Sequence, residues 1–261
     1  LITEKVDTNI FKTIVNRGKR LPENSVIEYD FGLKAKVLDI LETGERVIRF
    51  ESETPVDDII ASQGQVPLPP YIHEKLDNYD RYQTVYAKTP GSCAAPTAGL
   101  HFTTELLEKL KAKTDTAFVT LNVGIGTFRP IKTDNIDDHI MHSEFYSIPE
   151  ETKNKIQNCK GRIISVGTTS TRALETASTG HRELTKLEGD SQLFIRPGYK
   201  FKTVDCLITN FHIPKSTLLL LVSALAGKEN IFNAYRKAVE LKYHFFSFGD
   251  AMFITDNEVQ L

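Results

Sequence analysis

The pattern of apolar and polar positions changes along the chain. Within residues 1–63, short runs of alternating apolar and polar residues occur at 11–15, 25–29, 33–38 and 46–50. Strands of this length at a spacing of about ten residues are typical of a small antiparallel barrel or sandwich. We therefore predict a β domain over residues 1–63.

The pattern after this region indicates a second domain over residues 64–261. Three prolines within Pro67-Leu68-Pro69-Pro70 make a stiff extended connector. Strand-like and helix-like segments then alternate, which is typical of an α/β fold. We expect strands at 117–123, 162–166, 204–209 and 251–254, and helices starting at Thr103 and covering 169–177, 216–226 and 230–241.

Composition narrows the class of protein. The 261 residues are 40% hydrophobic and 25% charged, as in a globular protein with a buried core. The three cysteines are widely spaced, which argues against a disulfide framework or a thiolate metal site and suits a reducing cytosol. The longest apolar run, 218–226, is too short to span a bilayer.

Charge leaves two interpretations of the first domain open. The net charge of −2 gives no general support for nucleic-acid binding. Basic residues nevertheless collect in the first domain, at Lys12, Arg17, Lys19, Arg20, Lys34 and Lys36. They form either an ordinary solvated face or a patch for a polyanion.

Long loops of small residues suggest a ligand site. Residues 91–103 contain mostly Gly, Ala, Ser, Pro and Thr and end in His101 and a helix start. Such residues leave main-chain N–H groups uncovered, so that a ligand can approach the backbone. Similar loops follow at 124–127, 166–170, 210–216 and 248–250. Together they favour one composite site, and hence an enzyme.

Two of these loops follow predicted strands. Val166-Gly167-Thr168-Thr169-Ser170 leads into a helix, whose free N–H groups and hydroxyls suit an anion or a ribose. An ordinary strand-to-helix turn explains it equally well. Gly124-Ile125-Gly126-Thr127 lacks the third glycine of a dinucleotide fingerprint, and Arg129-Pro130 prevents an immediate helix. Arg129 is better interpreted as a partner for an anion.

Charged side chains supply the remaining candidates. His142 and Glu144 would face the same side of a strand, as an acid/base or orienting pair requires. A metal site here is less well supported than a surface cluster. Lys215 stands near a helix N-terminus, against the preference of the helix dipole, which favours a bound anion. Asp250 places a carboxylate in a turn.

Several segments together resemble a known family. They are 67–72, 81–86, 94–102, 126–130, 141–144, 166–170, 197–199, 209–216 and 245–252. In this order the chain is similar to the S-adenosylmethionine:tRNA ribosyltransferase-isomerases of queuosine biosynthesis, over residues 67–252.

The resemblance implies an α/β domain with an inserted small antiparallel β-barrel domain. It also implies transfer and isomerisation of the ribosyl group of S-adenosylmethionine onto 7-aminomethyl-7-deazaguanine at the tRNA wobble position. Epoxyqueuosine would form, with release of adenine and methionine. The expected partners are this tRNA and S-adenosylmethionine as a substrate. We expect no metal, no other cofactor and no membrane, and a cytoplasmic monomer.

Two departures from the family are notable. The family's N-terminal segment is absent from this sequence, so a non-catalytic tRNA-binding fragment of the same scaffold is the alternative. Asn122 also stands where the family usually has a histidine. An amide cannot act as a general base near neutral pH, so we place no base there.

The site residues follow from the loops and the resemblance together. The candidate catalytic residues are His101, His142, Glu144, His212 and Asp250. The candidate substrate-binding residues are Thr97, Gly99, Gly126, Thr127, Arg129, Gly167, Thr168, Thr169, Ser170, Arg172, Asn210 and Lys215.

Overall fold

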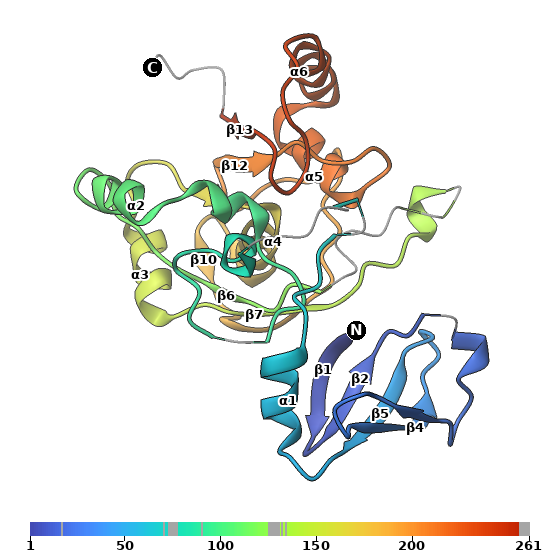
Figure 1. Ribbon diagram of the computed structural model, residues 1–261. Coiled ribbons are helices and arrows are strands. Elements are labelled where there is room, and N and C mark those ends of the chain that lie inside the picture. The colour runs from blue at the N-terminus through green and yellow to red at the C-terminus, as the bar shows by residue number, and fades with distance from the viewer. Residues whose placement is uncertain are drawn as a thin grey trace. The chain divides into compact units, whose positions relative to one another are not determined.

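The computed structural model divides the chain into two compact units, Leu1–Leu68 and Pro69–Leu261 (Figure 1). The residues that it describes are 1–16, 18–69, 71–72, 78–89, 91–124, 131, 133 and 135–255. The division falls within the proline-rich segment, slightly beyond the expected boundary at 63/64.

The first unit is a five-stranded antiparallel sheet with the strand order β1-β2-β5-β4-β3. Its elements are β1 (Ile2–Asp7), β2 (Ile10–Thr13), η1 (Gly18–Arg20), β3 (Val26–Glu28), β4 (Lys34–Ile40), β5 (Arg46–Glu51) and α1 (Val56–Gln63). Every expected strand run is present, and β1 adds a further strand.

One face of this sheet forms the core of the unit. Alternate residues such as Phe11, Val37 and Ile48 are buried, as the sequence alternation predicts. Val56 and Ile59 of α1 pack into the same cluster. The expected closed barrel is not seen, because within the described residues the outer strands β1 and β3 pair on one side only. The sheet is open, and α1 covers apolar surface that closure would otherwise bury.

The second unit contains a mixed sheet with the order β13-β12-β8. β8 (Ile164–Val166) and β12 (Cys206–Asn210) are parallel, and β13 (Ala251–Ile254) runs antiparallel to β12. The helices that complete this part are α4 (Thr168–Ala177), α5 (Thr217–Ala226) and α6 (Lys228–Glu240). Leu207, Val222 and Ile231 are fully buried in their shared core.

A second, antiparallel sheet with the order β11-β7-β6 contacts the other side of α4. Its strands are β6 (Thr120–Leu121), β7 (Glu144–Ser147) and β11 (Glu188–Ser191). The unit also contains η2 (Tyr79–Tyr82), η3 (Thr97–His101), α2 (Thr104–Lys111), η5 (Ile136–Asp138), α3 (Glu150–Asn158), β9 (Ser178–Gly180) and β10 (Glu183–Leu184). Tyr146, Ala173 and Leu184 belong to the core between these elements.

The helix boundaries follow local chemistry. Thr103 and Ser216 cap α2 and α5, because each hydroxyl accepts from a backbone N–H three residues on, at 3.2 Å. Gly227 ends α5 with a φ of +84°. The two helices that start after these residues were predicted correctly. The strand expected over 117–123 is shorter, since only Thr120–Leu121 pair with β7.

Candidate active site

A pocket opens at the carboxyl ends of the two parallel strands β8 and β12, where ligands bind in many α/β proteins. We call it the β8–β12 pocket. It lies within the second unit, and residues from six segments line it: Tyr71, Ala95–Ala98, Val123, Gly167–Thr169, Thr209–Ile213 with Leu218, and Phe246 with Ser247. Three of the predicted loops, 91–103, 166–170 and 210–216, therefore contribute to one cavity.

The turn after β8 forms one wall of the pocket. Gly167 has a φ of +90°, which L side chains rarely adopt, and a Cβ there would meet Ala98 Cβ at 3.7 Å. The chain then enters α4 at Thr168, and both Thr168 and Thr169 line the pocket. The first N–H groups of a helix have no acceptor within it. This wall therefore offers hydroxyls and amides to an anion or a sugar.

Asn210, at the end of β12, forms the facing wall. Its Oδ1 accepts from Thr97 Oγ1 at 3.4 Å, and its Nδ2 lies 3.0 Å from His101 Nε2. With the amide donating, the Nε2 lone pair of His101 is occupied and the ring proton lies on Nδ1. Burial lowers the pKa of His101, and the nearby charge of Asp250 opposes this change. His101 is therefore a neutral imidazole that contacts the side-chain amide of Asn210.

His212 lies in the wall of the pocket itself and is almost completely buried. Its Nε2 is 3.0 Å from Thr209 Oγ1, and its backbone N–H donates to Tyr235 Oη at 2.7 Å. Burial lowers the pKa of His212 to about 4. The imidazole is therefore neutral at physiological pH.

The loop before β13 forms the third side. Phe246 has a φ of +72°, an uncommon conformation for a bulky residue and one that tends to occur at functional sites. Ser247 Oγ contacts Tyr71 Oη at 2.6 Å. Asp250 is tied to the start of the loop, because its Oδ2 accepts from the N–H of His244 at 2.7 Å. A Cβ on Gly249 would lie 2.4 Å from His244 O, so the tight turn requires glycine.

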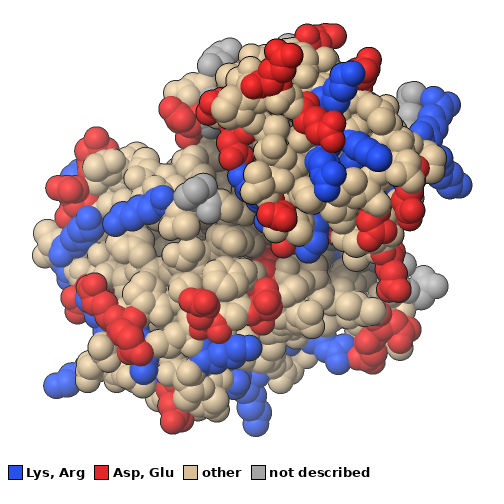
Figure 2. Space-filling model, turned by 90° about the horizontal axis from the view of Figure 1, so that it is seen from below, with Lys and Arg blue, Asp and Glu red and all other residues tan. Residues whose placement is uncertain are grey.

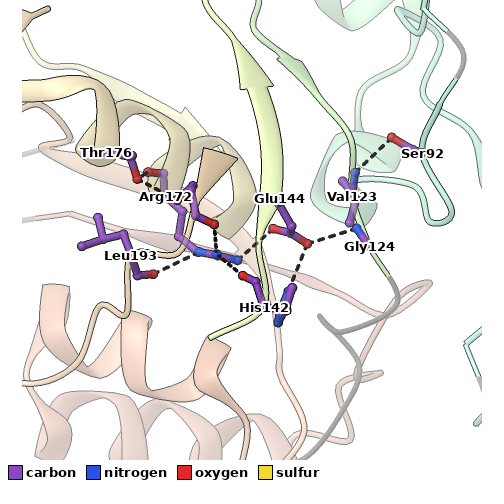
Figure 3. Close-up of polar contacts among 9 residues, drawn as sticks. Ser92, Val123, Gly124, His142, Glu144, Arg172, Thr176 and Leu193 are labelled. Atoms are coloured by element: carbon purple, nitrogen blue, oxygen red, sulfur yellow. Dashed lines mark hydrogen bonds and ion pairs between the residues drawn. The ribbon is translucent and has the colours of Figure 1, made fainter. Parts of the chain in front are cut away.

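A second polar cluster, the Arg172–Glu144 cluster, is closed within the protein (Figure 3). The two side chains are 5% and 4% exposed, and Arg172 Nη1 donates to Glu144 Oε2 at 2.8 Å. Arg172 also donates to the carbonyls of His142, Ser191 and Leu193. These contacts join α4 to the strand segments of the second sheet.

The other oxygen of Glu144 is also used. Figure 3 shows Oε1 between the N–H of Gly124, which donates at 3.2 Å, and His142 Nε2, also at 3.2 Å. His142 and Glu144 thus approach each other as their spacing predicts. The cluster fixes the backbone just before residues 125–130, and none of its charged side chains lines the β8–β12 pocket.

Other candidates lie outside the pocket wall. A Cβ on Gly99 would approach Tyr86 Oη at 2.1 Å, so this glycine permits close packing of η3, and it does not line the pocket. Ser170 lies on α4 but does not line the pocket. Lys215 is exposed, with a φ of +57°, and its carbonyl accepts from Ile131. Gly126, Thr127 and Arg129 lie outside the described residues.

Tyr71, Phe246 and Ser247 are among the pocket residues that sequence reasoning missed. Tyr71 directly follows the proline-rich connector, and this position was a signal that could have found it. The aromatic run 245–248 reads as core, and only the positive φ of Phe246 turns part of it toward the pocket. Among the described residues, no three His, Cys, Asp or Glu side chains gather as metal ligands would.

The charges on the surface are mixed. Figure 2 shows Lys and Arg interspersed with Asp and Glu. Residues 1–68 contain nine Lys and Arg against twelve Asp and Glu. Lys12 and Lys34 each pair with a glutamate, at 2.7 and 3.0 Å. Lys36 and Arg49, by contrast, are directly opposed across β4 and β5. Arg17 lies outside the described residues.

Fold and pocket are those of an enzyme of mixed α/β architecture. The family described as queuosine biosynthesis protein matches residues 1–254, and the chain belongs to this family. No helix in the described part of the chain is long and apolar enough to cross a membrane.

Named relatives agree with the family. The S-adenosylmethionine:tRNA ribosyltransferase-isomerase of Clostridium kluyveri is 52% identical, and the alignment covers 97% of this chain and 76% of that protein. The enzyme of the same name from Acetivibrio thermocellus is 51% identical, with the same coverage. A crystal structure of S-adenosylmethionine tRNA ribosyltransferase from Thermotoga maritima is also similar, with 36% sequence identity. The alignment covers 97% of this chain and 73% of the Thermotoga chain, with a TM-score of 0.49.

Proposed function

We propose that this protein is an S-adenosylmethionine:tRNA ribosyltransferase-isomerase. It transfers the ribosyl group of S-adenosylmethionine to 7-aminomethyl-7-deazaguanine at the wobble position of tRNA and isomerises it, and adenine and methionine are released. Family membership supports the reaction class. The observation that carries the proposal is the β8–β12 pocket, which brings hydroxyls, a helix N-terminus, an amide and a neutral imidazole together around one cavity.

The walls of the pocket suit different parts of S-adenosylmethionine. The N-terminus of α4, with the hydroxyls of Thr168 and Thr169, suits the methionine carboxylate, because a helix N-terminus favours negative charge. Asn210 can hydrogen-bond to a ribose oxygen. The aromatic rings of Tyr71 and Phe246, with centroids 5.0 Å apart, suit the adenine.

His212 is our candidate for the base. The reaction requires a proton to leave the carbon beside the sulfonium, whose positive charge makes that carbon acidic. His212 is neutral down to about pH 4, so its ring can accept a proton at physiological pH. His101, held by Asn210, would position that amide instead. We assign His142, Glu144 and Arg172 to holding the backbone at Gly124.

The first unit is our candidate for part of the tRNA contact. Like charges directly opposed on a sheet repel each other, and an RNA phosphate between Lys36 and Arg49 would relieve that repulsion. The carboxylates elsewhere in this unit confine the contact to a small area. Because the proposed substrate is a tRNA, we propose that the protein acts in the cytoplasm. We also propose that it acts as a monomer and with no cofactor.

The test is an incubation of the protein with S-adenosylmethionine and tRNA that carries the aminomethyl-deazaguanine. Mass spectrometry of the digested nucleosides should show the epoxycyclopentyl adduct, with adenine released in equal amount. Adenine release that continues without tRNA would instead indicate a nucleoside hydrolase. Binding of tRNA with neither product would indicate a binding protein on the same scaffold.

The variant Thr168→Ala/Thr169→Ala sharpens this test. It should raise KM for S-adenosylmethionine and leave the affinity for tRNA unchanged. A matched control is Thr185→Ala, which removes an exposed hydroxyl of the second unit that lines neither the pocket nor the groove described below.

A further inference from the structure

A second groove is formed in part by two segments that also line the β8–β12 pocket. Its lining includes Arg81, Gln83, Val85, Leu100 and Phe248. Pro96–Ala98 and Ser247 line the pocket, whereas Leu100 and Phe248, from the same two segments, line the groove. The groove and the pocket are therefore neighbours along both of these segments.

The segment 81–85 contributes residues to the groove and is packed tightly on η3. From residue 81 to 85 exposed and buried side chains alternate, so that Arg81, Gln83 and Val85 face outward and Tyr82 and Thr84 face inward. The inward side packs so tightly on η3 that a Cβ on Gly99 would lie 2.7 Å from Thr84 Cγ2. The outward side chains are thus presented from a fixed backbone.

An aromatic ring and a guanidinium group form the functional part of this surface. Phe248 is 39% exposed, although the edge of the buried Tyr82 ring supports it, with centroids 5.9 Å apart. The guanidinium carbon of Arg81 lies over the Phe248 ring at 5.8 Å from its centroid. Arg81 is exposed and makes no ion pair with another described residue. Unpaired bases stack on such rings and guanidinium planes.

The charge of the groove decides between a base and a phosphate. Asp80 and Glu105 also line it, so two carboxylates accompany the one guanidinium. A phosphate would be repelled by this surplus of negative charge. A base is uncharged, and its exocyclic amino groups can donate to carboxylates.

We propose that this groove binds an unstacked base of the tRNA that neighbours the modified nucleotide, with the base stacked on Arg81 and Phe248. This rests on the proposed function, because tRNA is the substrate there. The groove would hold the anticodon loop in register while the aminomethyl group reaches the pocket.

The test measures binding separately from turnover. An anticodon stem-loop RNA with 2-aminopurine beside the wobble position is titrated with the protein, and its fluorescence should be quenched by stacking. Phe248→Ala should abolish the quenching and weaken RNA binding about tenfold, as expected for the loss of one stacked base. Phe248→Trp should restore both. KM for S-adenosylmethionine should not change.

Matched variants make the result specific. Phe232→Ala removes another exposed phenylalanine, on α6, and should leave RNA binding unchanged. Arg81→Ala should weaken binding without changing the slope of log K against log salt. A slope smaller by about 0.7 would show that Arg81 binds a phosphate of a single strand, which would overturn the stacking proposal.

The two proposals can fail separately. If the wild type forms the adduct and Phe248→Ala binds RNA as tightly as wild type, only the groove proposal is wrong. If RNA binding depends on Phe248 but no adduct forms, the groove proposal stands and the proposed function is wrong.

Discussion

The two polar clusters of the second unit differ in where their hydrogen-bonding groups point. In the Arg172–Glu144 cluster, four Arg172 contacts and both Glu144 oxygens are used by the protein itself. In the β8–β12 pocket, Thr168, Asn210 and His212 stand in the wall of a cavity. A charged pair that is fully satisfied internally stabilises structure, whereas polar groups that line a cavity remain available to a ligand.

The largest effect should come from breaking the closed cluster. Glu144→Gln leaves the buried guanidinium of Arg172 without a counter-charge, and removing one partner of a buried pair costs about 3–5 kcal/mol. Urea unfolding measures the loss. The control is Glu150→Gln, whose exposed pair with Lys153 should contribute at most about 1 kcal/mol.

The double variant Glu144→Leu/Arg172→Met keeps this test informative. Because it buries no unpaired charge, it should be less destabilised than Glu144→Gln. If Glu144→Gln matched its surface control, the cluster would not be the structural element that we describe.

The second largest effect concerns pH and the pocket. The folded pKa of His212 is about 4, below the ordinary 6.5, so the unfolded chain binds more protons between these values. The contribution to stability is therefore complete above pH 6.5 and is lost as pH falls toward 4, by up to about 3 kcal/mol.

Unfolding free energies from pH 4 to 7 should therefore rise less steeply in His212→Gln than in wild type. Burial also lowers the pKa of His101, but His101 is present in both proteins, so its contribution cancels in the difference. Equal slopes would contradict the burial of a neutral imidazole in the pocket wall.

The difference between the clusters also explains what the sequence could predict. The spacing of His142 and Glu144 is local, and their contact was predicted. Arg172 was predicted only as a substrate-binding residue, because the sequence cannot reveal its pairing with a carboxylate 28 positions earlier in the chain. Only the packing of α4 on the second sheet reveals that pairing.

The fold shows the same limit. Helices with a hydroxyl cap and a continuous apolar face, such as α5, were predicted within a residue or two. α3 was missed, because its sequence is mostly polar and it buries only Thr152 and Ile156. The predicted barrel was not confirmed, because the alternation of strands reveals which face is buried, but not whether the edge strands meet.

A smaller effect should separate packing from ligand contact in η3. Gly99→Ala would bring its methyl group to 2.1 Å from Tyr86 Oη, and overpacking of this kind costs about 1–3 kcal/mol. Tyr86→Phe removes that oxygen, so the double variant should recover part of the lost stability in a thermal unfolding experiment. A loss of activity in Gly99→Ala that Tyr86→Phe does not reduce would favour a direct substrate contact instead.

The smallest effect on stability should come from the first unit, where the opposed charges of Lys36 and Arg49 have no internal partner among the described residues. Lys36→Gln removes this repulsion, so stability should stay constant or rise by about 0.5 kcal/mol. Binding of tRNA should nevertheless weaken, and the slope of log K against log salt should decrease by about 1.

Lys12→Gln is the matched control, because Lys12 already pairs with Glu4 at 2.7 Å. Its effect on the salt slope should be smaller than that of Lys36→Gln. Equal changes would mean that any lysine of the sheet contributes through net charge alone. A loss of stability in Lys36→Gln would mean that its charge is satisfied within the protein, as in the Arg172–Glu144 cluster, and the proposed phosphate contact would be wrong.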